Sequence, residues 1–195
     1  MTKADECTSE ATNEGEKWTT NSSQCLVVEG LLLLLRDTLL VLPDNMAHQV
    51  LNHVVRAEAL LVMANHADNR VRTAVVKVLC AYLQRSTDEE VNKFLKLKGF
   101  HQLANQLALY PACVELVEAC VTLVTRCHAP LEDQLEVSSL SDLSFLQLHS
   151  FPPLLALLPR AVRDVGLCHN MVLFLREVVT KVGSQHGAVS PRGGH

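Results

Sequence analysis

The chain has 195 residues, of which 48% are apolar and 4% aromatic, and its formal net charge is −4. That length suits one domain with tails or a short stack of helical repeats. The weak negative charge excludes the strongly basic surfaces that follow a nucleic-acid backbone or an anionic membrane. Because Leu, Val and Ala supply most of the apolar residues, we expect helices packed on helices rather than a sheet rich in Tyr, Phe and Thr.

Both ends of the chain are polar, and both are predicted to be disordered tails. Residues 1–24 are acidic and rich in Thr, Ser, Asn and Glu, and residues 183–195 are rich in Gly. The chain starts without the basic and apolar segments of a secretory signal. The apolar run at 26–42 contains charged residues and is too short to span a bilayer. We therefore expect a cytoplasmic protein without direct membrane insertion.

The first part of the body, which spans residues 25–182, reads as helices separated by short breaks. The first helix is predicted over 25–42 and is stopped by Pro43. The second begins with Asp44 as its N-cap and carries apolar residues at helical spacing. Residues 66–69 form the next break, and a third helix is predicted over 70–84.

The middle of the body carries the clearest helix-end signals. Thr87 is followed three residues later by Glu90, which is the pattern of a capping box. Gly99 follows two lysines and is predicted to end that helix. Two further helices are expected over 100–109 and 112–126, each closed by a proline soon after.

The last part of the body is less regular. One or two short helices are expected over 131–148, where several serines interrupt the apolar periodicity. Pro152 and Pro153 open another helix, since proline is tolerated in a first helical turn. A final helix is predicted over 164–182 with Gly183 as its C-cap. No strand pattern of convincing length interrupts these helices, so the predicted fold is all-α.

The break at 66–69 and the helix after it carry a repeat signal. Asp68 precedes the pair Val71 and Arg72, and an Ala- and Val-rich face follows. An Asp in the turn can accept hydrogen bonds from free helix amides, and an Arg one turn later can bridge to a neighbouring turn. Gly99 opens a similar phrase further along. With an approximate period of about 40 residues, these residues predict an armadillo/HEAT-like α-solenoid, a right-handed superhelix of antiparallel helix pairs.

Three stretches together resemble one family more closely: residues 54–61, 71–84 and 94–107. They resemble the armadillo-like helical region of the large BEACH–WD40 scaffold proteins, and their lysosomal trafficking regulator group in particular. The resemblance covers roughly residues 26–182. It implies a cytosolic scaffold in membrane traffic, autophagy and lysosome size control. The chain has no BEACH, PH-like or WD40 module, so functions that depend on those modules are not expected of it.

The cysteines and histidines are the main candidates for chemistry. Cys113, Cys120 and Cys127 recur every seven residues and would share one helix face, which is the pattern of a cysteine-lined core rather than of a zinc site. The sharper alternative is a redox-sensitive or palmitoylated face. Cys127 and His128 are adjacent, so on a helix their side chains diverge. We therefore predict no catalytic residues, no metal site and no cofactor.

Three hypotheses for function follow. The leading one is a scaffold that binds protein partners on a concave helical face, without nucleic acid. A second is a structural fragment or short isoform of a larger solenoid, because an apolar face near Leu31 would stay open without a preceding repeat. The third and least supported is an enzyme that depends on Cys or His.

Overall fold

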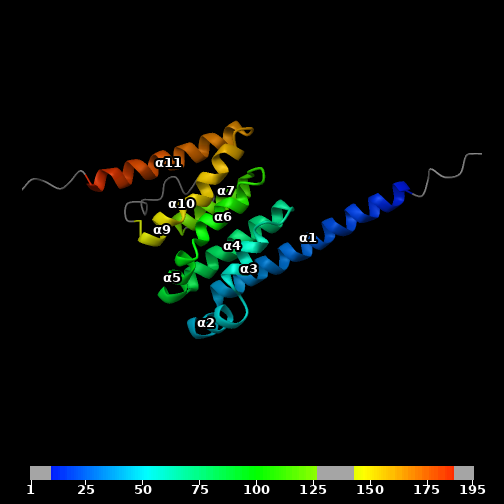
Figure 1. Ribbon diagram of the computed structural model, residues 1–195, viewed down its shortest axis with the longest axis horizontal. Helices are drawn as coiled ribbons and strands as arrows, with labels where there is room; N and C mark the ends of the chain where they lie inside the picture. Colours follow the sequence, from blue (N-terminus) through cyan, green and yellow to red (C-terminus); the bar gives the residue numbers. More distant parts are fainter. Residues whose placement is uncertain (1–9, 127–142, 187–195) are drawn as a thin grey trace, which may run out of the picture.

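The computed structural model describes residues 10–126 and 143–186, and the side chains of residues 22–126 and 143–180. Every regular element in this described part is a helix, which confirms the predicted all-α class (Figure 1). The elements are α1 (Glu10–Val41), α2 (Asp44–His53), α3 (Ala57–Met63), α4 (Asn69–Arg85), α5 (Asp88–Lys96), α6 (Gly99–Leu107), α7 (Val114–Thr125), α9 (Phe145–His149), α10 (Phe151–Leu157), the short 3-10 turn η2 (Leu158–Arg160) and α11 (Val165–His186).

Helix α4 forms the centre of the core. Residues 71–76 and 78–83 are all buried, so the helix is covered on nearly every side. It packs against α1, α3 and α7, while α10 packs against α6 and α7. An α-helix that is apolar around its whole circumference needs neighbours on all sides, which is why α4 lies inside the molecule. The superhelical solenoid itself stays a prediction.

Two helix starts agree with their sequence signals. Asp68 is the N-cap of α4, where its side chain accepts a hydrogen bond from the Arg70 amide at 2.8 Å. Thr87 caps α5 in a full capping box, with the Glu90 carboxylate accepting from the Thr87 amide at 2.7 Å. Each of these side chains satisfies a helix amide that has no partner within the helix.

The boundaries of the first two helices differ from expectation. Helix α1 begins at Glu10, so it includes residues that were expected to lie in a disordered tail. Once a helix is nucleated by packing, adding each further turn is inexpensive, and moderate helix formers can follow. Asp44 is the first residue of α2 rather than its N-cap, which is Pro43, and its carboxylate pairs with Arg85 instead.

The expected second helix is divided in two. Helix α2 ends at His53 and α3 starts at Ala57, with Arg56 in an extended conformation between them. The neighbouring Val54 and Val55 are β-branched and have low helix propensity, which favours a break at this point. This break separates α2 from α3 and leaves a hollow beside them.

The prediction that Gly99 ends a helix is wrong. The residue in the left-handed conformation is Lys98, with φ of 53°, and Gly99 is the first residue of α6. Gly99 is buried against the Phe94 ring, and a Cβ added to it would lie 2.3 Å from that ring. Its role is therefore to let two helices approach closely.

The C-terminal elements agree in part. Pro152 and Pro153 lie in the first turn of α10, as expected. Helix α11 continues to His186, so Gly183 is not its C-cap. Of the one or two helices expected over 131–148, α9 is present, and residues 127–142 lie outside the described part.

Candidate interaction groove

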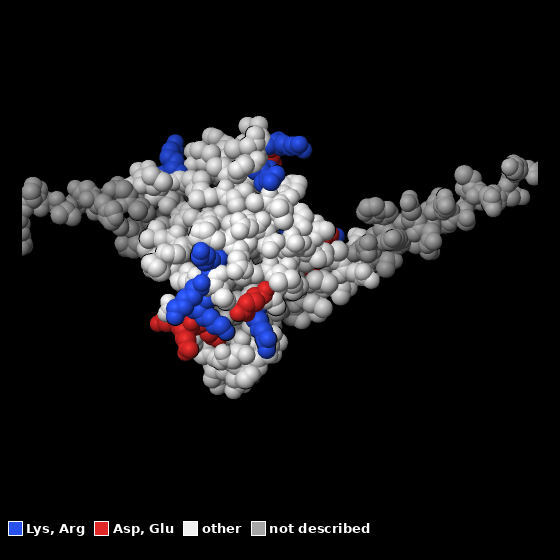
Figure 2. All heavy atoms as spheres, viewed as in Figure 1, with Lys and Arg blue, Asp and Glu red and all other residues white. Residues whose placement is uncertain are grey.

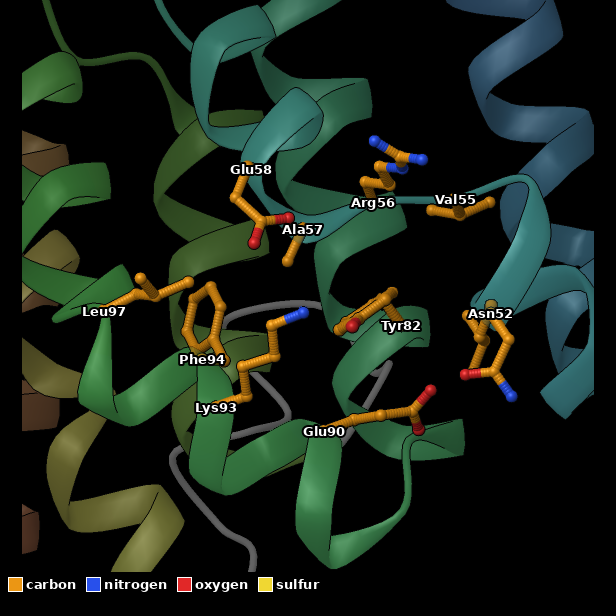
Figure 3. Close-up of a pocket in the computed structure, with 11 residues that line it drawn as sticks. Asn52, Val55, Arg56, Ala57, Glu58, Tyr82, Glu90, Lys93, Phe94 and Leu97 are labelled. Atoms are coloured by element: carbon orange, nitrogen blue, oxygen red, sulfur yellow. The ribbon is translucent and has the colours of Figure 1, made fainter.

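A hollow of about 450 Å³ lies between the α2–α3 connection and α5 (Figure 3). Its apolar wall consists of Leu51, Val55, Ala57, Tyr82, Phe94 and Leu97. Tyr82 is contributed by the end of α4, and Phe94 and Leu97 by α5 and its end. The hollow exists because α2 and α3 diverge at Arg56, so no helix covers this side of α5.

Charged and polar side chains surround the apolar wall. Glu58 on α3 and Lys93 on α5 point toward the hollow. Arg56 in the α2–α3 connection and Asn52 near the end of α2 line another side of it (Figure 3). All of these side chains are exposed. Glu90 also lines the hollow, but its carboxylate accepts hydrogen bonds from Thr87. An apolar wall with charges of both signs on its rim is suited to a peptide segment that buries an apolar side chain.

A second hollow continues the first along α5. It shares Asn52, Glu90 and Lys93 with the first and adds Thr87, Glu89, Asn92 and Lys96. On the face shown in Figure 2, basic and acidic side chains gather over this part of the molecule. We refer to the two hollows together as the α5 groove. Burial raises the pKa of Tyr82, so its phenol is neutral at physiological pH.

Three of the residues predicted to mark repeats, Asp68, Val71 and Arg72, lie at the turn before α4, and the fourth, Gly99, lies at the start of α6. Val71 is fully buried in the core. The side chain of Asp68 also pairs with Arg70, whose Nη2 lies 3.0 Å from Oδ2. The hydrogen bond from Arg70 is the main cause that lowers the pKa of Asp68 to about 2. The Asp68 carboxylate is therefore ionised at physiological pH, and its negative charge interacts favourably with the positive end of the α4 dipole.

Arg72 joins this turn to the turn between α6 and α7. Its Nη1 donates to the carbonyls of His66 and Ala67, both at 2.7 Å. Its guanidinium lies over the Tyr110 ring, 4.1 Å from the centroid, and burial lowers the pKa of the Arg72 guanidinium. The Tyr110 hydroxyl donates to the Asn65 carbonyl at 2.9 Å. Asn65, Arg72 and Tyr110 thus connect the α3–α4 turn with the turn between α6 and α7.

Several groove residues lie in the stretches that carry the family resemblance or in the capping box, but nothing in the sequence marks them, or Tyr110, as part of an interaction site. Lys93 and Phe94 lie in an ordinary amphipathic helix, and Tyr110 attracted less notice than the helix-breaking Pro111 beside it. One sequence signal does relate Arg72 to Tyr110. It is an Arg in a turn motif that is followed some 40 residues later by an aromatic residue and a proline.

Two cysteines of the described part, Cys80 and Cys120, show no sign of an activated thiol. Cys80 and Cys120 are buried, and burial raises the pKa of both, to about 12 for Cys80. Cys113 is half-buried, donates to Asn69 and accepts from the Leu116 amide as the N-cap of α7. Cys127 and His128 lie outside the described residues.

A further thiol, Cys25, faces the turn before α4. It shares a hollow with His66 and Asp68, but burial and the Asp68 charge raise the pKa of the thiol. The His66 ring accepts from the Asp68 amide at 3.0 Å, which commits it to the turn. This Cys–His–Asp grouping therefore works against a thiolate rather than in favour of one.

No three His, Cys, Asp or Glu side chains among the described residues gather closely enough to hold a metal ion. Among the described helices, none has the length and apolar character needed to cross a membrane.

Comparison with known proteins confirms the predicted resemblance to the lysosomal trafficking regulator group. The chain is 34% identical to the lysosomal-trafficking regulator of Homo sapiens over 150 residues, which are 77% of this chain and 4% of that protein. It is 37% identical to the lysosomal-trafficking regulator of Drosophila melanogaster over 103 residues, which are 53% of this chain and 3% of that protein. No family model and no solved structure matches the chain.

Proposed function

We propose that this chain is a non-enzymatic scaffold segment that binds a protein partner in the α5 groove and acts in lysosomal or autophagic membrane traffic in the cytoplasm. The similarity to two lysosomal-trafficking regulators carries the proposal. The stacked turns joined by Arg72 and Tyr110 support a solenoid of armadillo/HEAT type, in which each repeat contacts its neighbours. The chain spans a few per cent of those relatives, so it provides one binding segment rather than their whole activity.

The groove supports a protein partner better than a small substrate. Its wall is apolar and its rim carries Glu58 and Lys93, both exposed and on facing helices. Apolar anchors surrounded by a polar rim are typical of protein interfaces. The raised thiol pKa values of Cys25, Cys80 and Cys120 give no support to the alternative of a Cys-dependent enzyme.

Proximity labelling in cells tests the proposal. The intact chain is compared with the charge-exchanged variant Glu58→Lys/Lys93→Glu, and the control Glu115→Lys/Arg163→Glu makes the same exchange at exposed positions outside the groove. We expect proteins of lysosomal or autophagic membranes to be labelled by the intact chain and the control, and to lose at least tenfold in labelling with the groove variant. Equal labelling by all three chains would refute the groove as the binding site.

A second candidate is a structural segment of a larger solenoid with no activity of its own. It is favoured by α1, where Leu31 and Leu34 are 61% and 63% exposed. This candidate requires that the isolated chain be unstable without adjoining repeats. A single cooperative thermal transition of the isolated chain, followed by circular dichroism, would argue against it.

A further inference from the structure

Helix α1 has two apolar faces, and only one of them is covered. Leu32 and Leu39 are buried, and this side of the helix packs on α4. On the opposite side, Val27, Leu31, Leu34 and Val41 are 62%, 61%, 63% and 84% exposed. A helix that is apolar on both sides is expected to have neighbours on both sides, and large contiguous apolar patches are uncommon on monomeric proteins.

The exposed side chains follow the spacing of a coiled-coil seam. Val27, Leu31, Leu34, Thr38 and Val41 are separated alternately by four and three residues, so they form one straight stripe. We refer to these five residues as the α1 stripe. From Val27 to Val41 the stripe is about 21 Å long at 1.5 Å per residue. Gly30 lies beside it, and a Cβ added there would meet nothing within 4 Å, so another helix can approach closely.

The charges around the α1 stripe favour a second copy over a charged partner. Asp37 is the exposed acidic residue beside it, and Arg36 neutralises it at 2.6 Å. The hydrogen bond with Asp68 is the main cause that raises the pKa of Arg70, and the half-buried Glu29 lies near enough to add to it. Two copies can therefore face each other without like-charge repulsion, whereas the stripe offers no fixed charge by which a charged helix would be selected.

The helix is also ordered before it binds. Because packing on α4 already orders α1, pairing of two helices carries no free-energy cost of folding the helix. Figure 1 shows α1 extending beyond the body of the protein, with α4 along one side of its packed half. A short helical pair of this length buries on the order of 1,000 Å², which lies at the small end of stable interfaces.

We infer that the α1 stripe is a self-association surface on which a second copy of this chain docks helix against helix, forming a reversible dimer. The body of each copy lies on the α4 side of its own α1, away from the seam. The dimer is independent of the α5 groove, which is lined by α2, the α2–α3 connection, α3, α4 and α5. Loss of one can therefore be measured while the other is intact.

Sedimentation velocity of the full chain from about 1 to about 100 µM tests this inference. We expect the intact chain to pass from monomer to dimer in this range, and Leu31→Glu/Leu34→Glu to weaken the dimer roughly a hundredfold because the seam would bury charge. The control is Val62→Glu/Val179→Glu, at positions that are 74% and 70% exposed on α3 and α11, and it should dimerise normally. Far-UV circular dichroism establishes that both variants are folded.

Two results would overturn the inference. One is an intact chain that stays monomeric up to the highest concentration, which would point to a helix of another protein as the occupant of the stripe. The other is a dimer that persists in the folded Leu31→Glu/Leu34→Glu variant, because the contact would then lie elsewhere. Equal labelling by the intact chain and the groove variant, with an unchanged dimer, would refute the proposed function and leave this inference standing.

Discussion

The turns before α4 and before α6 are held in different ways, although both carry residues that were predicted to mark repeats. The α3–α4 turn depends on polar side chains: Asp68 caps the helix, and Arg72 donates to two turn carbonyls. The α5–α6 turn depends on shape, because Gly99 lets the Phe94 ring pack against the start of α6. Lys98, in the left-handed conformation, makes the change of direction there.

The two turns lose stability through different kinds of substitution. The polar turn holds a buried cation and therefore loses stability when a donor is removed. The shape-based turn contains no such group, and it loses stability when an atom is added. Four substitutions separate these two behaviours.

Arg72→Ala should have the largest effect, a loss of about 2–4 kcal/mol in the free energy of unfolding. Arg72 is only 3% exposed, and its removal leaves the His66 and Ala67 carbonyls without their donor and Tyr110 without the cation over its ring. Arg72→Lys should recover only part of this loss, because an ammonium lacks the planar fork. Chemical denaturation measures both, with the exposed Arg163→Ala as the control; equal stability of Arg72→Ala and the control would contradict the account.

Gly99→Ala should reduce stability by about 1–3 kcal/mol, because the new methyl group displaces the buried Phe94 ring. Gly30→Ala is the matched control at a protein concentration low enough to keep the chain monomeric: Gly30 is also helical, and its added Cβ meets nothing within 4 Å. That substitution should stabilise by about 0.5–1 kcal/mol through helix propensity. The same sign for both substitutions in thermal unfolding would show that shape does not decide the α5–α6 turn.

The two turns also show how far a sequence can be interpreted. The Asp68 cap and the Thr87–Glu90 box were predictable because each joins residues within three positions of one another. The contact between Arg72 and Tyr110 joins turns far apart in the chain, and only folding brings them together. Gly99 was correctly noticed but given the wrong role, since a glycine beside a helix end signals a left-handed turn and a close packing contact equally well. The α5 groove depends on the break at Arg56, which the helical periodicity of residues 44–62 concealed.

Asp68→Asn should remove a pH-dependent part of the stability while keeping the cap, since Asn is also a good N-cap. The pKa of Asp68 is about 2 in the folded protein and about 3.9 in an unfolded chain. A lowered folded pKa adds stability that is complete above about pH 4 and is lost as the pH falls toward 2. Arg70 is only half-buried and solvent screens its pair with Asp68, so the expected contribution is about 1 kcal/mol.

Denaturation of the intact chain and of Asp68→Asn between about pH 2 and pH 6 measures this contribution. The intact chain should be more stable at pH 6, and the two unfolding free energies should converge near pH 2. Curves that stay parallel across the range would show that the Asp68 charge does not stabilise the α3–α4 turn.

Tyr110→Phe should have the smallest effect, a loss of about 0.5–1 kcal/mol. The phenyl ring keeps the stacking contact with Arg72, and only the hydroxyl bonds to Asn65 are lost. Because Asn65 is exposed, water can replace that hydroxyl. Tyr110→Leu removes the ring as well. If the cation–π contact joins the two turns, this variant should lose clearly more stability than Tyr110→Phe. If the Phe and Leu variants unfold at the same denaturant concentration, the aromatic face contributes nothing, and the Arg72 effect must come from its hydrogen bonds to the turn alone.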